Sequence, residues 1–393
     1  MQLFGEIVVY IIMACAIIGC FASIFKEESK LGNEFLEGIN SIGAIFLPVA
    51  GIMASAPYLT IFVSSVFGPL FGLVGADQAM AATTFIAVDM GGYQLAEQLA
   101  QTKESWIMAM MTGYMAGATI VFSIPVALKM LRKEDRRYLA MGTMVGFITI
   151  PIGVLVASAI IALTNPIIRD TITTTGEGSY ELLLSFGLIF SNLIPLVIIC
   201  GLIALGLYFK PEMMIKGFNV FGKVMDSTLR IVFVFCVVEY FTGIFTTLFG
   251  SWGFEPIIAD EIDINRALEI SGYIGIMLCG AFPMVYMIKT YLAKPLATIG
   301  SKLGLSADAT AGILAGTANV LALFGMVKEL KPEDKVKCIA YSVCCAFLIG
   351  DHLAFTANFQ PSLILPVMLG KLCAGILAVY IASKFITTKL LKL

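Results

Sequence analysis

Phe85-Ile86-Ala87-Val88-Asp89-Met90-Gly91-Gly92 places a carboxylate and two glycines inside an apolar stretch that would otherwise form a continuous helix. A second carboxylate inside an apolar stretch, in Gly350-Asp351-His352, lies near the other end of the chain. An ionised carboxylate in hydrocarbon costs at least about 2.5 kcal/mol, and such residues usually face a bundle interior or an aqueous path. Both carboxylates are therefore predicted to mark a site inside a membrane protein.

The composition supports a membrane protein. Of the 393 residues, 59% are hydrophobic and 13% are charged, whereas a soluble domain usually carries about 25% charged residues. The net charge of −2 does not predict a nucleic-acid partner. The nine cysteines form no spaced pair beside a histidine, and no nucleotide-binding motif is present, so we predict neither a metal nor a cofactor. The first apolar helix lacks a preceding basic region and is predicted to be retained.

Eleven apolar segments approach the length of about 20 residues that a membrane helix needs. They are Phe4–Phe25, Ile42–Phe67, Met80–Ala100, Ser105–Leu128, Ala140–Leu163, Leu182–Phe209, Ile231–Gly250, Ile270–Thr290, Ser306–Met326, Lys337–Asn358 and Ser362–Ile386. Small and polar residues fill the third and ninth segments, which predicts broken or re-entrant helices there. The predicted fold is an all-α integral membrane protein with nine to eleven membrane segments.

Charged loops predict the orientation, because cationic loops tend to stay in the cytoplasm. The loops after segments four, six, eight and nine are rich in lysine and arginine, whereas the loop after segment seven contains Asp260, Glu261 and Asp263. If segments three and nine return to the side from which they enter, nine crossings remain. The N-terminus then lies outside, and the C-terminus, with Lys389 and Lys392, lies in the cytoplasm. The predicted location is the bacterial inner membrane.

Two pairs of segments indicate an internal repeat. Residues 37–43 resemble residues 269–275 at an offset of 232, and residues 117–123 resemble residues 350–356 at an offset of 233. Pro48 is predicted to break its helix, as is Pro283 in the second copy. Under the orientation above the two copies enter from opposite sides, which is the inverted-repeat design of many secondary transporters. We predict one transmembrane domain, 1–393, with repeat halves 1–163 and 216–393 joined by 164–215.

The charged residues inside the segments are the leading candidates for a site. Asp89, beside backbone opened by glycines, offers a counter-charge and acceptors for a small organic cation. Asp351 either pairs structurally with Lys371, or contacts substrate or handles a proton. His352 either titrates near neutral pH or is a satisfied core residue. Glu239 is a candidate for a coupling proton, a second counter-charge or an ion pair.

Neighbouring residues complete the predicted substrate site. Hydroxyl and amide side chains donate to a substrate or join helices, and aromatic faces attract ammonium groups or pack. The repeat places segments three, four, nine and ten around one cavity. The additional candidates for substrate binding are Gly91, Gly92, Thr119, Phe122, Ser123, Asn319, Phe355 and Thr356.

Several strings resemble one family. Residues 88–96, 119–128, 135–140 and 350–353 are similar to the EutH family of ethanolamine-utilisation membrane proteins. The resemblance spans almost the whole chain and implies an inner-membrane permease that admits ethanolamine for breakdown in the cytoplasm. It implies no set of binding residues, so the site above depends on the residues alone.

Together these observations predict a carrier that binds the ethanolamine cation between inverted halves and alternates its access. Asp89 is the first counter-ion and Asp351 the second. The main alternative is a channel-like, uncoupled facilitator for ethanolamine or a related amine. A membrane-embedded aspartyl enzyme or a sensor fits less well, because the local sequence and attached domains that these need are missing. Lipid surrounds the protein, and a homo-oligomer stays open as an option.

Overall fold

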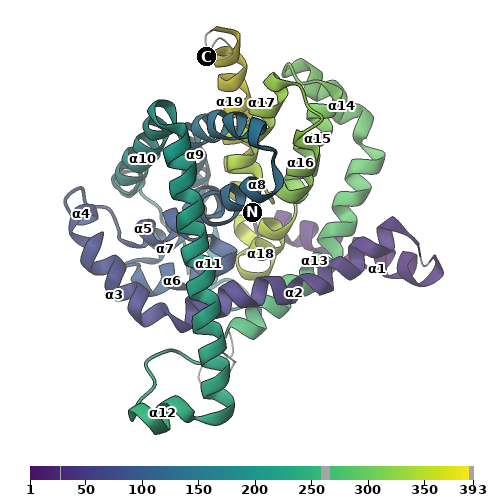
Figure 1. The fold of residues 1–393 in the computed structure, drawn as a ribbon. Coiled ribbons are helices and arrows are strands. Elements are labelled where there is room, and N and C mark those ends of the chain that lie inside the picture. Colours follow the sequence, from purple (N-terminus) through teal and green to yellow (C-terminus); the bar gives the residue numbers. More distant parts are fainter. Residues whose placement is uncertain (27, 258–265, 389–393) are drawn as a thin grey trace.

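The structure, a computed structural model, describes residues 1–26, 28–257 and 266–388 (Figure 1). The acidic residues Asp260, Glu261 and Asp263 and the terminal Lys389 and Lys392, which entered the prediction of orientation, lie outside the described residues.

The first part of the chain folds into helices that vary greatly in length. They are α1 (Gln2–Phe25), α2 (Lys30–Ala54), α3 (Ala56–Val66), α4 (Gly68–Gly72), α5 (Ala79–Phe85), η1 (Val88–Met90), α6 (Gly92–Leu99), α7 (Lys103–Thr112), η2 (Gly113–Gly117), η3 (Thr119–Ser123), α8 (Ile124–Met130), η4 (Lys133–Asp135) and α9 (Arg136–Thr164). The elements η2 and η3 are π-helical turns within one helical stretch, Lys103–Met130.

A short hairpin and one helix connect the two parts. The strands β1 (Ile167–Ile168) and β2 (Tyr180–Glu181) pair antiparallel, and α10 (Phe186–Phe209) follows. Arg169 fixes this hairpin to α18, because its guanidinium donates to the carbonyls of Asn358 and Phe359 at 2.5 and 3.4 Å. A cation at the end of a helix is a favourable partner for its last carbonyls.

The remaining helices form the second part. They are α11 (Pro211–Thr242), α12 (Ile244–Phe249), α13 (Ala267–Tyr291), α14 (Ala293–Lys302), α15 (Ala307–Ala318), α16 (Val320–Val327), α17 (Pro332–Cys345), α18 (Asp351–Phe359), η5 (Pro361–Leu363) and α19 (Ile364–Thr388). In Figure 1, α11 crosses the front of the molecule and ends beside the protruding α12.

Seven helical stretches in the described part of the chain are long and apolar enough to cross a membrane. They are Gln2–Phe25, Lys30–Ala54, Lys103–Met130, Lys133–Thr164, Phe186–Phe209, Ala267–Tyr291 and Pro361–Lys384. Large apolar side chains on the outer faces of these helices are exposed, such as Leu202 at 63% and Phe209 at 68% on α10. Such an exterior suits lipid, since a soluble protein rarely exposes broad apolar patches. The chain is thus an all-α, multi-pass membrane protein.

The core lies where α9 packs against α10, α17 and α19, while α2 packs along α13 and α11. Two expectations about these helices were wrong. Both α2 and α13 continue through Pro48 and Pro283, because neighbouring helices in a membrane bundle compensate for the lost backbone bond. The predicted second segment, Ile42–Phe67, is instead divided at Ser55 into α2 and the separate helix α3. Helix α2 also begins earlier than predicted, at Lys30.

Candidate functional site

The third apolar segment breaks where its sequence contains Asp89 and the glycine pair. Helix α5 ends at Phe85, and Gly91 adopts φ of +93°, a conformation that favours glycine. The amides of Met90 and Gly92 both donate to the carbonyl of Ala87, at 3.2 and 3.0 Å. Asp89 therefore lies on a tight turn between two short helices, as predicted.

The tenth segment also breaks, which the sequence did not predict. Helix α17 ends at Cys345 and α18 begins at Asp351. Between them Phe347 has a positive φ of 59°, rare for a residue with a side chain. The amides of Phe347 and Ile349 donate across to the carbonyls of Gly316 and Thr317 on α15, at 3.2 and 2.9 Å. These bonds to α15 hold the break in place.

The two breaks bring four charged or titratable groups together. His352 Nε2 lies 3.9 Å from Asp89 Oδ1, and Lys371 Nζ lies 2.8 Å from His352 Nδ1. Lys371 is fully buried and also donates to the carbonyl of Tyr114 at 2.8 Å. The described contacts of the Lys371 ammonium are with His352 and Tyr114, and none of them is with Asp351, the partner considered from the sequence. We refer to Asp89, Asp351, His352 and Lys371 as the central cluster.

Two atoms of the central cluster face each other without a hydrogen-bond partner among the described residues. They are Asp89 Oδ1 and His352 Nε2, both inaccessible to solvent. Their separation of 3.9 Å is too long for a hydrogen bond. Buried polar atoms are nearly always paired, so each exception calls for an explanation. The side chain of Asp89 as a whole keeps 17% of its surface exposed.

The electrostatics of the central cluster favour a cation. The carboxylates of Asp89 and Asp351 lie close enough to repel each other, whereas Lys371 attracts Asp89. Counted with both carboxylates and the Lys371 ammonium ionised and His352 neutral, the cluster has a formal charge of −1. A small ligand with one positive charge would neutralise this formal charge and provide a partner for a buried carboxylate.

Aromatic rings enclose the cluster on one side. The ring centroids of Tyr114 and Phe347 lie 5.0 and 5.6 Å from that of His352. Phe122 packs against Phe347 at 5.7 Å. Phe355 is instead fully buried against Tyr114 and other rings, so its place is in the aromatic core.

The predicted hydroxyl and amide candidates all bond to protein groups. Thr119 donates to the carbonyl of Val343 at 2.8 Å, and Ser123 to that of Ala118 at 3.3 Å. Thr356 donates to the carbonyl of His352 at 2.7 Å. Thr119 thereby joins two helices, and Thr356 does so through a second hydrogen bond, to the hydroxyl of Tyr114 at 2.5 Å, whereas the bond of Ser123 stays within its own helical stretch.

Asn319 and Glu239 act at helix ends. Asn319 interrupts the ninth segment between α15 and α16, and its side chain caps α16 by accepting from the amide of Leu321 at 2.9 Å. The break predicted for this segment is therefore present. Glu239 accepts from the amide of Phe245 at 2.8 Å and from the hydroxyl of Thr246, at the start of α12. The structure does not bring Glu239 to the central cluster.

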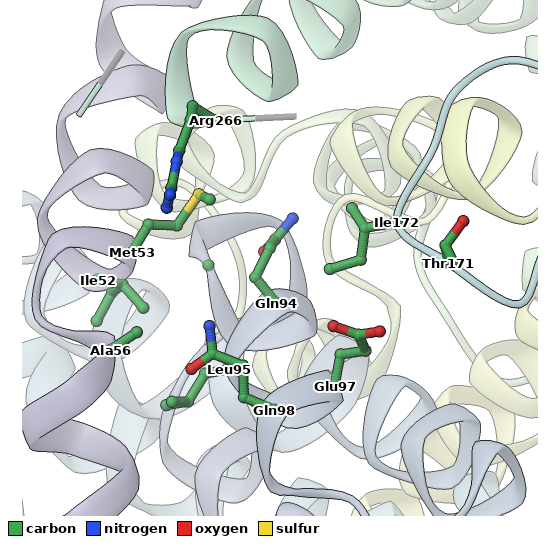
Figure 2. Close-up of a pocket in the computed structure, with 11 residues that line it drawn as sticks. Ile52, Met53, Ala56, Gln94, Leu95, Glu97, Gln98, Thr171, Ile172 and Arg266 are labelled. Carbon is green, nitrogen blue, oxygen red and sulfur yellow. The ribbon is translucent and has the colours of Figure 1, made fainter. Parts of the chain in front are cut away.

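A cavity of about 230 Å³ lies on one side of the third-segment break (Figure 2). We call it the Gln94 cavity; its lining includes Ile52, Gly91, Gln94, Glu97 and Arg266. Figure 2 shows the side chain of Gln94 pointing into the space between Met53 and Ile172. Gln94 was not among the sequence candidates, since a single polar residue just after a helix break carries no distinctive pattern.

A second cavity of about 380 Å³ lies on the other side of the break. We call it the Phe122 cavity; its lining includes Ile52, Met90, Phe122, Lys129 and Lys223. Ile52 lines both cavities, and a Cβ placed on Gly91 would lie only 2.7 Å from the Ile52 side chain. The two cavities are therefore separated by a tight contact next to Asp89.

Among the described residues no group of acids, cysteines and histidine could hold a metal.

A multi-pass helical membrane protein with interrupted helices, buried charges and cavities next to the break in its third segment belongs to the broad class of membrane transporters. Comparison with known proteins identifies the family. Residues 4–385 match the family described as "Ethanolamine utilisation protein, EutH", and the chain belongs to it.

Named relatives agree with this assignment. The chain is 38% identical over 376 residues to the "Probable ethanolamine permease EutH" of Listeria monocytogenes, covering 95% of this chain and 92% of the relative. It is 35% identical to proteins of that name in Salmonella typhimurium and Escherichia coli K12, covering 97% of this chain and 95% of each relative. It is 30% identical to the "Uncharacterized protein YxeR" of Bacillus subtilis, covering 96% and 94%. No solved structure matches the chain.

Proposed function

We propose that this chain is a permease for ethanolamine in the bacterial inner membrane, and not an enzyme. The observation that carries the proposal is the unpaired, buried carboxylate oxygen of Asp89 in a cluster with a formal charge of −1. Protonated ethanolamine is a small cation with three ammonium donors, and a carboxylate is their natural acceptor. The names of the relatives support the same substrate.

The mechanism that we propose is alternating access with Asp89 as the first counter-ion and Asp351 as the second. The Gln94 and Phe122 cavities reach opposite sides of the same break and meet at Ile52. A single contact between two cavities favours a carrier over a continuous pore, because opening one cavity further need not open the other. Lysines around the Phe122 cavity favour a cytoplasmic location for that end.

An inverted repeat with halves 1–163 and 216–393 gives this carrier its symmetry. The breaks of segments three and nine are packed alike, each against a glycine of the following segment. A Cβ on Gly117 would lie 2.3 Å from the carbonyl of Ile86, and a Cβ on Gly350 would lie 2.2 Å from that of Ala318. The offsets of 233 and 232 are those of the sequence repeat. Close backbone approach at small residues is typical of helix contacts in membranes.

Nine crossings follow if segments three and nine are re-entrant. The seven long apolar helices supply seven, α11 the eighth and the broken pair α17 and α18 the ninth. With 32 residues, α11 is about 48 Å long at 1.5 Å per residue, more than the thickness of the hydrocarbon core. The N-terminus then lies outside and the C-terminus inside.

Transport by the purified protein in lipid vesicles tests the proposal. Vesicles with the protein should take up labelled ethanolamine, and unlabelled ethanolamine inside should accelerate that uptake. Uptake without acceleration from the opposite side would indicate the channel-like facilitator. No uptake above that of protein-free vesicles, with correctly folded protein present, would refute the permease.

A further inference from the structure

The side chain of Gln94 is buried without using its hydrogen-bonding capacity. It lies on α6, five residues after Asp89, and is 5% exposed. Neither its Nε2 nor its Oε1 has a hydrogen-bond partner among the described residues. Figure 2 shows this amide directed into the Gln94 cavity. A buried amide that lacks both a donor and an acceptor partner is costly, so a ligand that supplies both would stabilise it.

Three other polar side chains around the cavity have partners. Glu97 pairs with Lys103 at 3.4 Å, Gln98 accepts from the hydroxyl of Thr60 at 3.4 Å, and Arg266 pairs with Glu255 at 3.5 Å. Gln94 differs from these three residues, because its amide lies in the cavity wall and forms no hydrogen bond with the described residues.

The chemistry of a carboxamide indicates the group it would bind. A primary amide offers NH donors and a carbonyl acceptor, and a hydroxyl both donates and accepts. An ammonium group only donates, which suits the carboxylate of Asp89 better. Gly91, which lines the cavity, lies between these two residues in the chain. The amide and the carboxylate thus stand at one helix break, one suited to a hydroxyl and the other to an ammonium.

We propose that Gln94 binds the hydroxyl group of the substrate and so selects amino alcohols over simple alkylamines. This inference rests on the proposed function, because it assigns the second polar end of the same substrate. A site built to bond a hydroxyl rejects an analogue that lacks it, since the buried protein groups are then left unpaired.

The test compares ethanolamine with ethylamine, which has the ammonium group and no hydroxyl. In wild-type vesicles, unlabelled ethanolamine should inhibit uptake of labelled ethanolamine at a much lower concentration than ethylamine does. In Gln94→Met, which keeps the length of the side chain, this preference should fall by about 10- to 100-fold, the equivalent of one or two hydrogen bonds. The affinity for ethylamine should change little.

Gln98→Met is the matched control, because Gln98 lines the same cavity but bonds to Thr60. It should keep the wild-type preference. Wild-type protein that transports ethanolamine but does not discriminate against ethylamine would overturn the inference even if Gln94→Met fails to fold. An unchanged preference in a folded Gln94→Met protein would overturn it too. In both cases the permease itself would stand, whereas absence of wild-type uptake would refute the proposed function.

Discussion

Replacing Asp89 by asparagine removes one formal charge from the central cluster while keeping the shape of the side chain. We take about 4 Å as the distance between a bound ammonium and this carboxylate, similar to the 3.9 Å that separates Asp89 from His352. Two unit charges at that distance attract each other by about 4 kcal/mol at an effective dielectric constant near 20. Because about 1.4 kcal/mol corresponds to a tenfold change, Asp89→Asn should weaken ethanolamine binding about a thousandfold.

Binding and uptake of labelled ethanolamine by purified protein in vesicles measure this effect. Asp170→Asn is a suitable control, since Asp170 is exposed beside the β1–β2 hairpin, and it should leave both quantities unchanged. Asp351→Asn should weaken binding less than Asp89→Asn does. Near-normal affinity in Asp89→Asn, or a larger loss in Asp351→Asn, would refute the assignment of Asp89 as the first counter-ion.

Three further substitutions probe the structure around the site. Lys371→Met leaves two buried acceptors without their donor and should destabilise the fold by about 2–6 kcal/mol, measured as a lower midpoint of unfolding in detergent. Gly350→Ala would place a methyl group 2.2 Å from the carbonyl of Ala318 and should reduce the yield of monodisperse protein, whereas Gly325→Ala meets nothing within 4 Å and should not. Glu239→Gln should retain uptake, because the carboxylate caps α12; a loss of uptake in folded protein would return Glu239 to the transport path.

The sequence predicted those features that depend on local chemistry. The pair Gly91 and Gly92 beside Asp89 indicated a break, and the structure has a left-handed turn there. The run of small residues before Asn319 indicated the break of the ninth segment in the same way. The overall class, an all-α membrane protein, followed from the apolar segments, because lipid leaves helices few alternatives.

Features that depend on tertiary contacts were not predictable. The turn after Cys345 contains mostly apolar residues, and the positive φ of Phe347 is stabilised by a partner more than 25 residues earlier in the chain. The contact of Lys371 with His352 requires α19 to lie beside α18, which no local pattern encodes. The predicted break at Pro48 was wrong for a related reason. Packing of α2 along α13 preserves a helix that the proline by itself would disfavour.

The two backbone bonds from Phe347 and Ile349 to α15 have a mechanical consequence. They join a helix of the ninth segment to the loop of the tenth through main-chain atoms, so no side-chain substitution can remove either donor except proline. The ninth and tenth segments are therefore expected to move together at this point. A movement of one segment against the other would have to break both bonds, so we expect a hinge to lie elsewhere in the chain.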